Sequence, residues 1–336
     1  MLELTSRPNP KVQPSQNVAN AAKRLSIPTS GLSLKSFSDY PRFCQVTVAQ
    51  LTPGSFSGNR QALVASSISG LCTTANQKYL QQVTVLCPSK LVFGFSNSEQ
   101  ALFFNGRQMT PNDIFVLHSH NTYDMVVAKN ASLFVICLDS ADNSTQNDQT
   151  TDTPINALIA QIKSTLAQND SPFLTHSQPR LRDQLAAHLL CTQGAGASEP
   201  PLAPALQLLK ASQSASYRPN SRNNLLSRTL RLMQSQPFHF RKISEVAEAC
   251  HVSQRGLEKA FHGALCSSPG EYLKAIQLNR YRMAVVDHAA NVKLSLADIA
   301  TQVGAVNYSR LSKDYKTFFG ELPSLTRKRI SANITS

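Results

Sequence analysis

Short apolar runs separated by turn residues fill the chain from residue 40 to residue 140. Such runs, rich in β-branched and aromatic residues and bounded by turn residues, are typical of short β-strands. The Asn105-Gly106 pair after Phe103-Phe104 favours a hairpin turn, because both residues adopt positive φ readily. The pattern predicts a small barrel or sandwich built from the runs FCQVTVAQL, ALVASSISGL, QVTVL, LVFGFS, ALFF, DIFVLH, YDMVVA and SLFVICL.

The apolar positions change to helical spacing after residue 154. Residues 141–154 are polar throughout and predict a flexible linker. Residues 155–168 and 180–193 each predict a helix, and the first carries an apolar stripe of Leu158, Ile159, Ile162 and Leu166. Such a stripe most often packs inside a protein; a dimer interface is the alternative.

The last 117 residues contain an internal repeat. Ala247 and Ala300 lie 53 positions apart. Five further pairs are offset by 54 positions: Leu257/Leu311, Phe261/Tyr315, Leu265/Phe319, Cys266/Gly320 and Pro269/Pro323. Because a solenoid needs three or more copies, two copies predict a duplicated small helical motif.

Each copy predicts a helix, a tight turn and a second helix. In the first copy, ISEVAEAC precedes a turn at His251-Val252, and Ser253 is a good N-cap for the helix QRGLEKAFHGAL. In the second copy, Ser295-Leu296-Ala297-Asp298 is a capping box.

The turn of the second copy is one residue longer than that of the first. Gly304 makes this turn, and the helix YSRLSKDYKTFF follows it. Between the copies, after Pro269, EYLKAIQLNRYRMAVVDH predicts a helix that holds the two units at a fixed separation. Its packed side is predicted to carry Tyr272, Leu273, Ile276, Met283 and Ala284.

These elements predict an α+β protein with four regions. Residues 1–30 form a loose leader, and residues 31–140 form a β-rich sensor or dimerisation domain. Residues 141–219 are a linker and a helical region. Residues 220–336 form an all-α domain with two helix-turn-helix units.

The formal net charge of +13 is concentrated in the all-α domain. Residues 220–336 contain 17 Lys and Arg against 8 Asp and Glu, whereas residues 141–219 contain 5 against 6. A basic domain favours contact with a polyanion, either nucleic acid or an acidic membrane surface. The seven scattered cysteines disfavour a disulfide framework or a zinc site. We expect a cytoplasmic protein, because no signal-peptide core and no run of about 18 apolar residues is present.

The second helix of each copy combines a packed face with a polar face. With Leu257 and Leu311 pointing inward, Phe261 and Tyr315 join them in the core at about 100° per residue. The opposite faces carry Arg255, Glu258, Lys259 and His262 in the first copy, and Ser309, Ser312, Lys313 and Lys316 in the second. A solvated face accounts for one such helix. Two matched faces favour helices that enter the major groove of DNA, where Arg or Lys reads guanine and Glu accepts from cytosine.

Three stretches of this domain resemble the DNA-binding domain of the AraC/XylS family of bacterial transcription regulators, over roughly residues 220–330. They are EVAEACHVSQRGLEKAF, SPGEYLKAIQLNRYRMA and LADIATQVGAVNYSRLSKDYKTFFGELPS. Ala305 and Leu311 stand where the family usually has Phe, and Cys266 where it often has Gly, which bears on helix packing more than on the fold. The resemblance implies two units in successive major grooves, about 34 Å apart, usually activating transcription. It also implies that a cupin-like β domain binds an effector or dimerises.

We therefore predict a sequence-specific DNA-binding transcription regulator with no catalytic residues, no metal and no cofactor, controlled by an effector or partner at the β-rich domain. Base contacts are assigned to Arg255, Glu258, Lys259, Asn307, Ser309, Ser312 and Lys313. Phosphate contacts are assigned to His262, Lys316, Arg327, Lys328 and Arg329. The expected partners are double-stranded DNA and RNA polymerase, a homodimer stays open, and the expected location is the nucleoid.

Two alternatives remain open. The first is a DNA-binding regulator without a small-molecule ligand, whose amino-terminal half only dimerises or meets a protein partner. The second is a metal-dependent cupin enzyme, because His118 and His120 would share one face of a strand. A full cupin site needs a nearby Glu and another His, and only Asp124 and the distant His176 follow. Surface histidines are therefore the favoured interpretation, and no nucleophile elbow, P-loop or Rossmann motif accompanies them.

Overall fold

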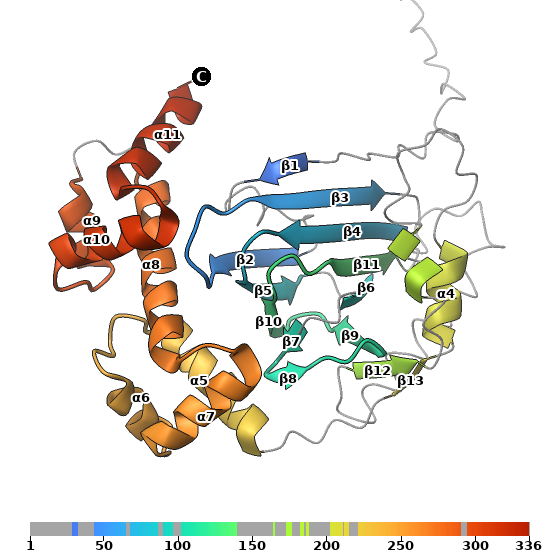
Figure 1. Cartoon of the computed structure of the whole chain (residues 1–336). Coiled ribbons are helices and arrows are strands. Elements are labelled where there is room, and N and C mark those ends of the chain that lie inside the picture. Colours follow the sequence, from blue (N-terminus) through green and yellow to red (C-terminus); the bar gives the residue numbers. More distant parts are fainter. Residues whose placement is uncertain are drawn as a thin grey trace, which may run out of the picture.

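The computed structural model describes residues 29–32, 44–64, 68–86, 90–96, 102–139, 164, 173–176, 182–184, 186–187, 202–210, 212–214, 221–289 and 294–335. Its layers follow one another in the order helix α4 (Leu202–Lys210), an eight-stranded sheet, a five-stranded sheet and a group of helices (Figure 1). The two sheets and α4 form the β domain. The helices of Ser221–Thr335 form the helical domain.

Both sheets are antiparallel in all their described strand pairings. The eight-stranded sheet has the order β1 (Thr29–Leu32), β3 (Gly58–Val64), β4 (Ile68–Ala75), β11 (Leu133–Asp139), β6 (Lys90–Ser96), β9 (Asp113–Leu117), β12 (Phe173–His176) and β13 (Ser212–Ser214). The five-stranded sheet has the order β2 (Cys44–Gln50), β5 (Tyr79–Val85), β10 (Thr122–Val127), β7 (Leu102–Phe104) and β8 (Arg107–Gln108). The predicted α+β class is confirmed, with the strands arranged as two facing sheets.

Side chains from both sheets fill the space between them. Val83 and Met125 of the five-stranded sheet and Leu133 of the eight-stranded sheet belong to one buried cluster. The ring of Phe104 stacks on Phe115 of the opposite sheet, with their centroids 5.0 Å apart. This packing confirms the predicted strands where they are described, and it places side chains of both sheets in one core. Strands β9 and β10 are buried along nearly their whole length, so they are covered on both faces.

The predicted hairpin turn lies between β7 and β8. Asn105 and Gly106 both have positive φ, 48° and 77°. Phe104 pairs with Arg107 across the turn. The prediction is confirmed, and the backbone explains it, since two successive positive φ values suit Asn-Gly.

Chain from the predicted linker and helical region completes the β domain. β12 pairs with β9, and β13 extends the same edge. Helix α4 covers the outer face of the eight-stranded sheet, where Leu208 and Leu209 join a buried cluster with Phe93 and Phe95. Region 141–219 therefore supplies two strands and a covering helix, because an apolar outer sheet face needs a second layer.

Most of the two helices predicted between residues 155 and 193 lies outside the described residues, including the apolar stripe of the first. Ser164 and residues 182–184 and 186–187 are helical where they are described. The predicted linker at 141–154 and nearly all of the predicted leader also lie outside the described residues.

The helical domain contains two helix-turn-helix units joined by one long helix (Figure 1). Helix α5 (Ser221–Ser235) precedes the first unit, which consists of α6 (Ile243–Ala249) and α7 (Gln254–Leu265). The second unit consists of α9 (Leu296–Gln302) and α10 (Tyr308–Phe319), and α11 (Pro323–Thr335) follows it. Helix α8 (Pro269–Asp287) connects the units. The bounds of α7 and α10 are those that the repeat predicts.

Side-chain caps begin the helices where the sequence predicts them. The hydroxyl of Ser253 accepts a hydrogen bond from Gly256 N at 3.1 Å. Ser295 and Asp298 bond reciprocally as a capping box at the start of α9. The hydroxyl and the backbone N–H of Ser295 both donate to the Asp298 carboxylate, and they lower its pKa below the usual value because they stabilise the ionised form. Both predicted caps are confirmed.

The repeat extends to the backbone angles at the turns and helix ends. His251 and Gly304 have φ of 54° and 95° in the two turns. Cys266 and Gly320 end α7 and α10 in the left-handed region, with φ of 47° and 75°. A residue with a Cβ atom is strained there, whereas glycine is not. The first copy therefore keeps the conformation of the second without its glycines.

Replacing Cys266 by Gly is expected to stabilise the protein by about 1 kcal/mol, because the left-handed strain exceeds the added backbone freedom of glycine in the unfolded chain. The exposed thiol makes little packing that could be lost. Chemical denaturation of the two proteins measures the difference. The matched Gly320→Ala variant should lose a similar amount, and equal loss in both variants would contradict the strain at Cys266.

Helix α8 is buried on most of its surface because it contacts α5, α7, α9, α10, α11 and β2. Tyr272, Leu273 and Ile276 are buried as predicted. Met283 was expected on the same packed side and is instead 40% exposed. That part of the prediction is wrong, because the helix serves two cores. Its first half packs in the first unit, and a different face packs in the second through Ala275, Leu278, Tyr281 and Val285.

The β domain packs directly on the helical domain. Leu80, Phe103 and Val126, on the outer face of the five-stranded sheet, share one buried cluster with Leu226 and Leu230 of α5. We call this contact, between the five-stranded sheet and α5, α7, α8 and α10, the interdomain seam. It makes part of the β domain an extension of the core of the first unit.

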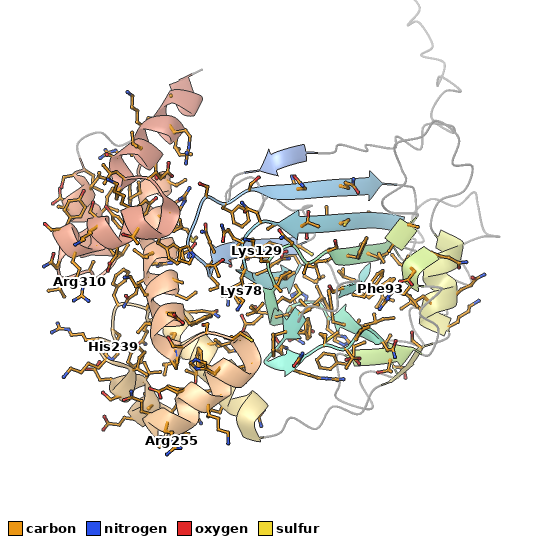
Figure 2. All side chains as sticks on the ribbon, viewed as in Figure 1. Lys78, Phe93, Lys129, His239, Arg255 and Arg310 are labelled. Carbon is orange, nitrogen blue, oxygen red and sulfur yellow. The ribbon has the colours of Figure 1, made fainter. Side chains whose placement is uncertain are left out.

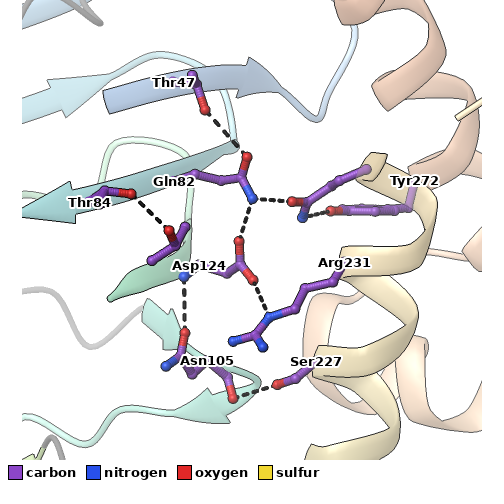
Figure 3. A network of polar contacts seen from close by, with 10 residues as sticks. Thr47, Gln82, Thr84, Asn105, Asp124, Ser227, Arg231 and Tyr272 are labelled. Carbon is purple, nitrogen blue, oxygen red and sulfur yellow. Dashed lines mark hydrogen bonds and ion pairs between the residues drawn. The ribbon is translucent and has the colours of Figure 1, made fainter. Parts of the chain in front are cut away.

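Polar contacts surround the apolar centre of the seam (Figure 3). Gln82 of β5 donates to Asp124 Oδ1 at 2.9 Å and to the side-chain oxygen of Gln234. Gln234 in turn donates to the hydroxyl of Tyr272 at 2.9 Å. Arg231 of α5 lies 3.5 Å from Asp124 Oδ2, so this nearly buried carboxylate has a cation across the seam. The network ties β5 and β10 to α5 and α8.

The β domain also contacts the carboxy-terminal end of the second helix in each unit. The ammonium group of Lys78 donates to Leu265 O, at the end of α7. Gly54 N donates to Phe318 O at 2.8 Å, near the end of α10. Both donors meet carbonyls at the negative end of a helix dipole. Burial lowers the pKa of Lys78 from its ordinary value.

Candidate nucleic-acid interface

Helix α7 presents a polar face opposite its packed face. Leu257 and Phe261 are fully buried, as predicted. Arg255, Lys259 and His262 are exposed. Figure 2 places Arg255 on the outer side of the helical domain, away from the sheets. These three predicted contact residues therefore share one accessible face.

Glu258 lies at the side of this face. Its residue is half-buried, and its carboxylate accepts a hydrogen bond from Gln254 Nε2 at 2.9 Å. The Gln254 bond uses only one carboxylate oxygen, so the other oxygen can accept from cytosine while the bond persists. Gln254 thus orients Glu258 without blocking its predicted base contact.

Helix α10 repeats the arrangement of α7. Leu311 and Tyr315 are buried, as predicted. Ser309, Lys313 and Lys316 are exposed on the opposite face, and Ser312 is half-buried, like its repeat equivalent Glu258. The two helices therefore expose cations at matching positions, and Lys259 and Lys313 are equivalent in the repeat.

Asn307 is the N-cap of α10. Its side-chain oxygen accepts a hydrogen bond from Arg310 N at 2.9 Å. The cap uses the amide oxygen, which fixes the orientation of the side chain at the amino-terminal end of the helix. The Nδ2 group then points outward as a donor, and base contact by Asn307 stays a prediction for that group.

The three basic residues of α11 have different surroundings. Arg327 donates to Leu294 O at 2.7 Å. Arg329 binds both carboxylate oxygens of Glu321, each at 2.9 Å. Lys328 is exposed. A phosphate contact by Arg329 therefore has to use the guanidinium N–H groups that do not face Glu321, whereas Lys328 has no such restriction.

Arg310 belongs to the exposed face of α10, and the sequence interpretation missed it. It is exposed, and Figure 2 shows it at the left edge of the helical domain, away from the sheets. Its repeat equivalent is Gly256, so comparison of the two copies gave no matching cation. The signal was in the helical rotation, since at about 100° per residue position 310 lies beside Lys313.

Ion pairs and aromatic contacts hold the second unit on α8. Lys274 Nζ lies 2.8 Å from Asp314 Oδ1 of α10. The guanidinium of Arg282 lies 4.5 Å from the ring centroid of Phe319 and 3.3 Å from Glu321. Through these contacts and the two cores, α8 fixes the relative position of α7 and α10.

The histidines of the alternative metal site lie at a turn between β9 and β10. His118 N donates to the hydroxyl of Tyr123 at 2.9 Å. His120 is exposed and has φ of 64°. No group of three or more potential metal ligands occurs among the residues that the structure describes. None of the described helices has the length and apolar character needed to cross a bilayer.

One protein family matches this region by its sequence model, described as a helix-turn-helix domain, over residues 246–329. The match covers both units, from α6 to α11. Residues 246–329 form a helix-turn-helix domain of the AraC/XylS type.

The curated relatives of this chain include two operon regulators. The XylDLEGF operon transcriptional activator of Pseudomonas putida is 29% identical over 92 residues, which are 27% of this chain and 28% of that protein. The Msm operon regulatory protein of Streptococcus mutans is 29% identical over 103 residues, 31% of this chain and 36% of that protein. The matches therefore span about a third of the length of these relatives.

Among solved structures, ToxT from Vibrio cholerae is 12% identical to this chain. The comparison covers 87% of this chain and 99% of ToxT, with a TM-score of 0.30. The AraC-type transcriptional regulator of Chromobacterium violaceum is 23% identical and covers 32% of this chain and 93% of that chain, with a TM-score of 0.29.

Proposed function

We propose that this protein is a transcription regulator that binds specific double-stranded DNA through two helix-turn-helix units in successive major grooves. One observation carries the proposal: α7 and α10 expose basic and polar side chains at equivalent positions of a repeat, on faces opposite their cores. Helices of this kind enter the major groove with their polar face toward the base edges. The AraC/XylS-type domain match supports the same function.

We propose further that the protein activates transcription by recruiting or positioning RNA polymerase, as a cytoplasmic protein bound to the nucleoid. A curated relative whose name describes a transcriptional activator supports this part. The exposed faces of α7 and α10 are proposed to bind DNA, and this binding requires neither a catalytic residue nor a cofactor.

The β domain is proposed to control DNA binding through the interdomain seam. The β domain contacts the carboxy-terminal ends of α7 and α10. A conformational change in the β domain would therefore reach both helices that are proposed to contact DNA. A polar cleft of about 470 Å³ opens at the seam, lined by both domains, including Asn105, His120, Asp124 and Arg231. Because both domains line it, this cleft is the place that we favour for an effector.

Replacing Lys316 by Ala is expected to weaken binding to all DNA sequences alike and to reduce the slope of log affinity against log salt by about 1. The reason is that a phosphate contact releases counterions and reads no base. Fluorescence anisotropy with a selected duplex and a random duplex, at several salt concentrations, measures both effects.

Lys210→Ala is the matched control, because Lys210 is exposed on α4, on the far side of the sheets from the helical domain (Figure 1). It should leave affinity and slope unchanged. Equal effects of the two variants would contradict the assignment of the helical domain to DNA. A wild-type protein that selects no sequence from a random library would overturn the proposed function.

A further inference from the structure

The two helix-turn-helix units differ by one residue in the turn between their helices. Val252 N donates to Ala247 O at 3.0 Å in the first unit, and Ala305 N donates to Ala300 O at 2.9 Å in the second. Val252 and Ala305 are therefore equivalent. In the first unit the N-cap follows at once, whereas in the second unit Val306 is inserted before the N-cap.

The inserted residue is the most exposed large apolar side chain of the described chain. Val306 is 82% exposed, and the next, Leu325, is 53% exposed. Val252 and Ala305 are instead partly buried against the cores of their units. The residue at the Val252 position therefore packs against the core of each unit, whereas Val306 adds no packing to the core of the second unit.

The surroundings of Val306 combine basic residues with apolar ones, among them Phe238, Phe240 and Leu273. Val306 lines a cleft of about 490 Å³ between the two units, together with Arg241, Lys274, Asn307 and Arg310. Val306 directly precedes the N-cap Asn307, at the end of α10 that leads into a major groove in helix-turn-helix proteins. An apolar side chain among cations suits an anionic partner that also offers a small apolar group.

We propose that Val306 is a specificity-determining residue that contacts the C5 methyl group of a thymine in the major groove entered by α10. The thymine methyl is the apolar feature of the major-groove edge, and a phosphate offers an aliphatic side chain nothing comparable. The proposal rests on the proposed DNA-binding function and adds the base that the second unit reads. Arg310, which lines the same cleft, and Lys313, exposed further along α10, supply the hydrogen bonds that Val306 lacks.

Deoxyuridine tests this proposal, because it differs from thymidine only by the C5 methyl group. The probe is a duplex selected by the wild-type protein from a random library, with each thymine replaced singly by deoxyuridine. Deoxyuridine at one of these positions should weaken wild-type binding by about fourfold, the effect of losing one buried methyl group from the interface. The Val306→Ala variant should bind the thymine duplex several-fold more weakly and lose nothing more at that deoxyuridine.

Leu325→Ala is the control, because it also shortens an exposed apolar side chain of the second half of the helical domain. It should keep the full loss at the deoxyuridine position. Thermal unfolding checks that each variant is folded, which is expected for exposed positions.

Three outcomes overturn the proposal. They are no sensitive thymine, a sensitive thymine whose effect persists in Val306→Ala, and equal behaviour of Val306→Ala and Leu325→Ala. In each of these, sequence-selective DNA binding by the wild-type protein still stands. If the wild-type protein selects no duplex at all, the proposed function fails as well, so the two failures are distinguishable.

Discussion

Asn279→Ala is expected to lower the free energy of unfolding by about 3 kcal/mol and to uncouple the two domains. Asn279 is only 2% exposed, although it lies in the middle of a helix. Its Oδ1 accepts from Gln50 N at 3.0 Å, and its Nδ2 donates to Gln50 O at 2.7 Å. The side chain thus pairs with the edge strand β2 as a neighbouring strand would.

The size of the effect follows from what the variant leaves behind. Alanine would leave the N–H and the C=O of Gln50 buried without these partners, and each such group costs about 1–3 kcal/mol. Urea denaturation followed by far-ultraviolet circular dichroism measures the loss, since the chain has no Trp for fluorescence. Arg280→Ala, next to Asn279 but exposed, is the control and should change stability little.

The Asn279→Asp variant distinguishes the contribution of the hydrogen bonds to stability from that of side-chain volume, because Asp and Asn have nearly the same size. Its carboxylate can accept from Gln50 N but faces the carbonyl oxygens of Gln50 and Ala275, which now accept from Nδ2. Burial and these oxygens should raise the pKa of the new carboxyl above its unfolded value of about 4. Stability relative to the wild type should therefore be recovered at low pH and lost as pH rises through the raised pKa.

Asn279→Ala should show no such pH dependence. Equal stability of Asn279→Ala and Arg280→Ala would contradict the seam as a structural coupling. The same variants test control by the β domain, because a loosened seam should change the affinity for the selected duplex although Asn279 touches no predicted DNA contact.

The two helix-turn-helix units were predictable almost to the residue because their signals are local, whereas helices α5 and α11 were not predicted. Ser253 and Ser295 cap helices within three residues of themselves, and Gly304 marks its own turn. The repeat added a second test of each assignment. Where the sequence prediction failed, at Met283, the cause was not local, since α8 turns different faces to two cores and to β2.

The seam could not be predicted, because it depends on pairs far apart in the sequence. In β5, Gln82 and Thr84 alternate with buried Val83 and Val85, a pattern typical of a strand with one face in water. That polar face instead lies toward α5, where Gln82 meets Gln234, 152 positions along the chain. A polar residue in the middle of a strand is compatible with a face exposed to solvent and with a face that packs in a polar interface, and the sequence does not distinguish the two.

The DNA-contacting residues were predictable as a face and less so one by one. Helical rotation placed Arg255, Lys259 and Lys313 correctly on exposed surfaces. It could not show that Arg329 pairs with Glu321, because Glu321 precedes α11 and helical rotation does not fix its position. Arg310 was missed because the prediction compared equivalent positions of the two copies. The equivalent residue in the first copy is Gly256, which has no side chain to match a cation.

Arg255→Ala and Lys313→Ala together are expected to weaken binding to the selected duplex by about 2–6 kcal/mol, the sum of about 1–3 kcal/mol for each base contact. The losses should add, because the two residues lie in separate units with separate cores and share no partner. Each single variant should relax sequence preference in its own half of the site only. Anisotropy titrations of the four proteins against the selected and single-substituted duplexes measure both effects.

The two losses add only if both units bind the same DNA molecule at the same time. We expect simultaneous binding because α8 holds the two units at a fixed separation. Lys274 and Asp314 fix α10 on that helix, so the spacing of the units cannot adjust freely. Inserting about five base pairs, half a helical turn, between the two halves of the site should place one half on the wrong face of the duplex. On that duplex one of the two single variants should become silent. A protein whose Arg255→Ala or Lys313→Ala variant is silent on the unmodified site would bind through one unit alone, and the two-groove arrangement would then be wrong.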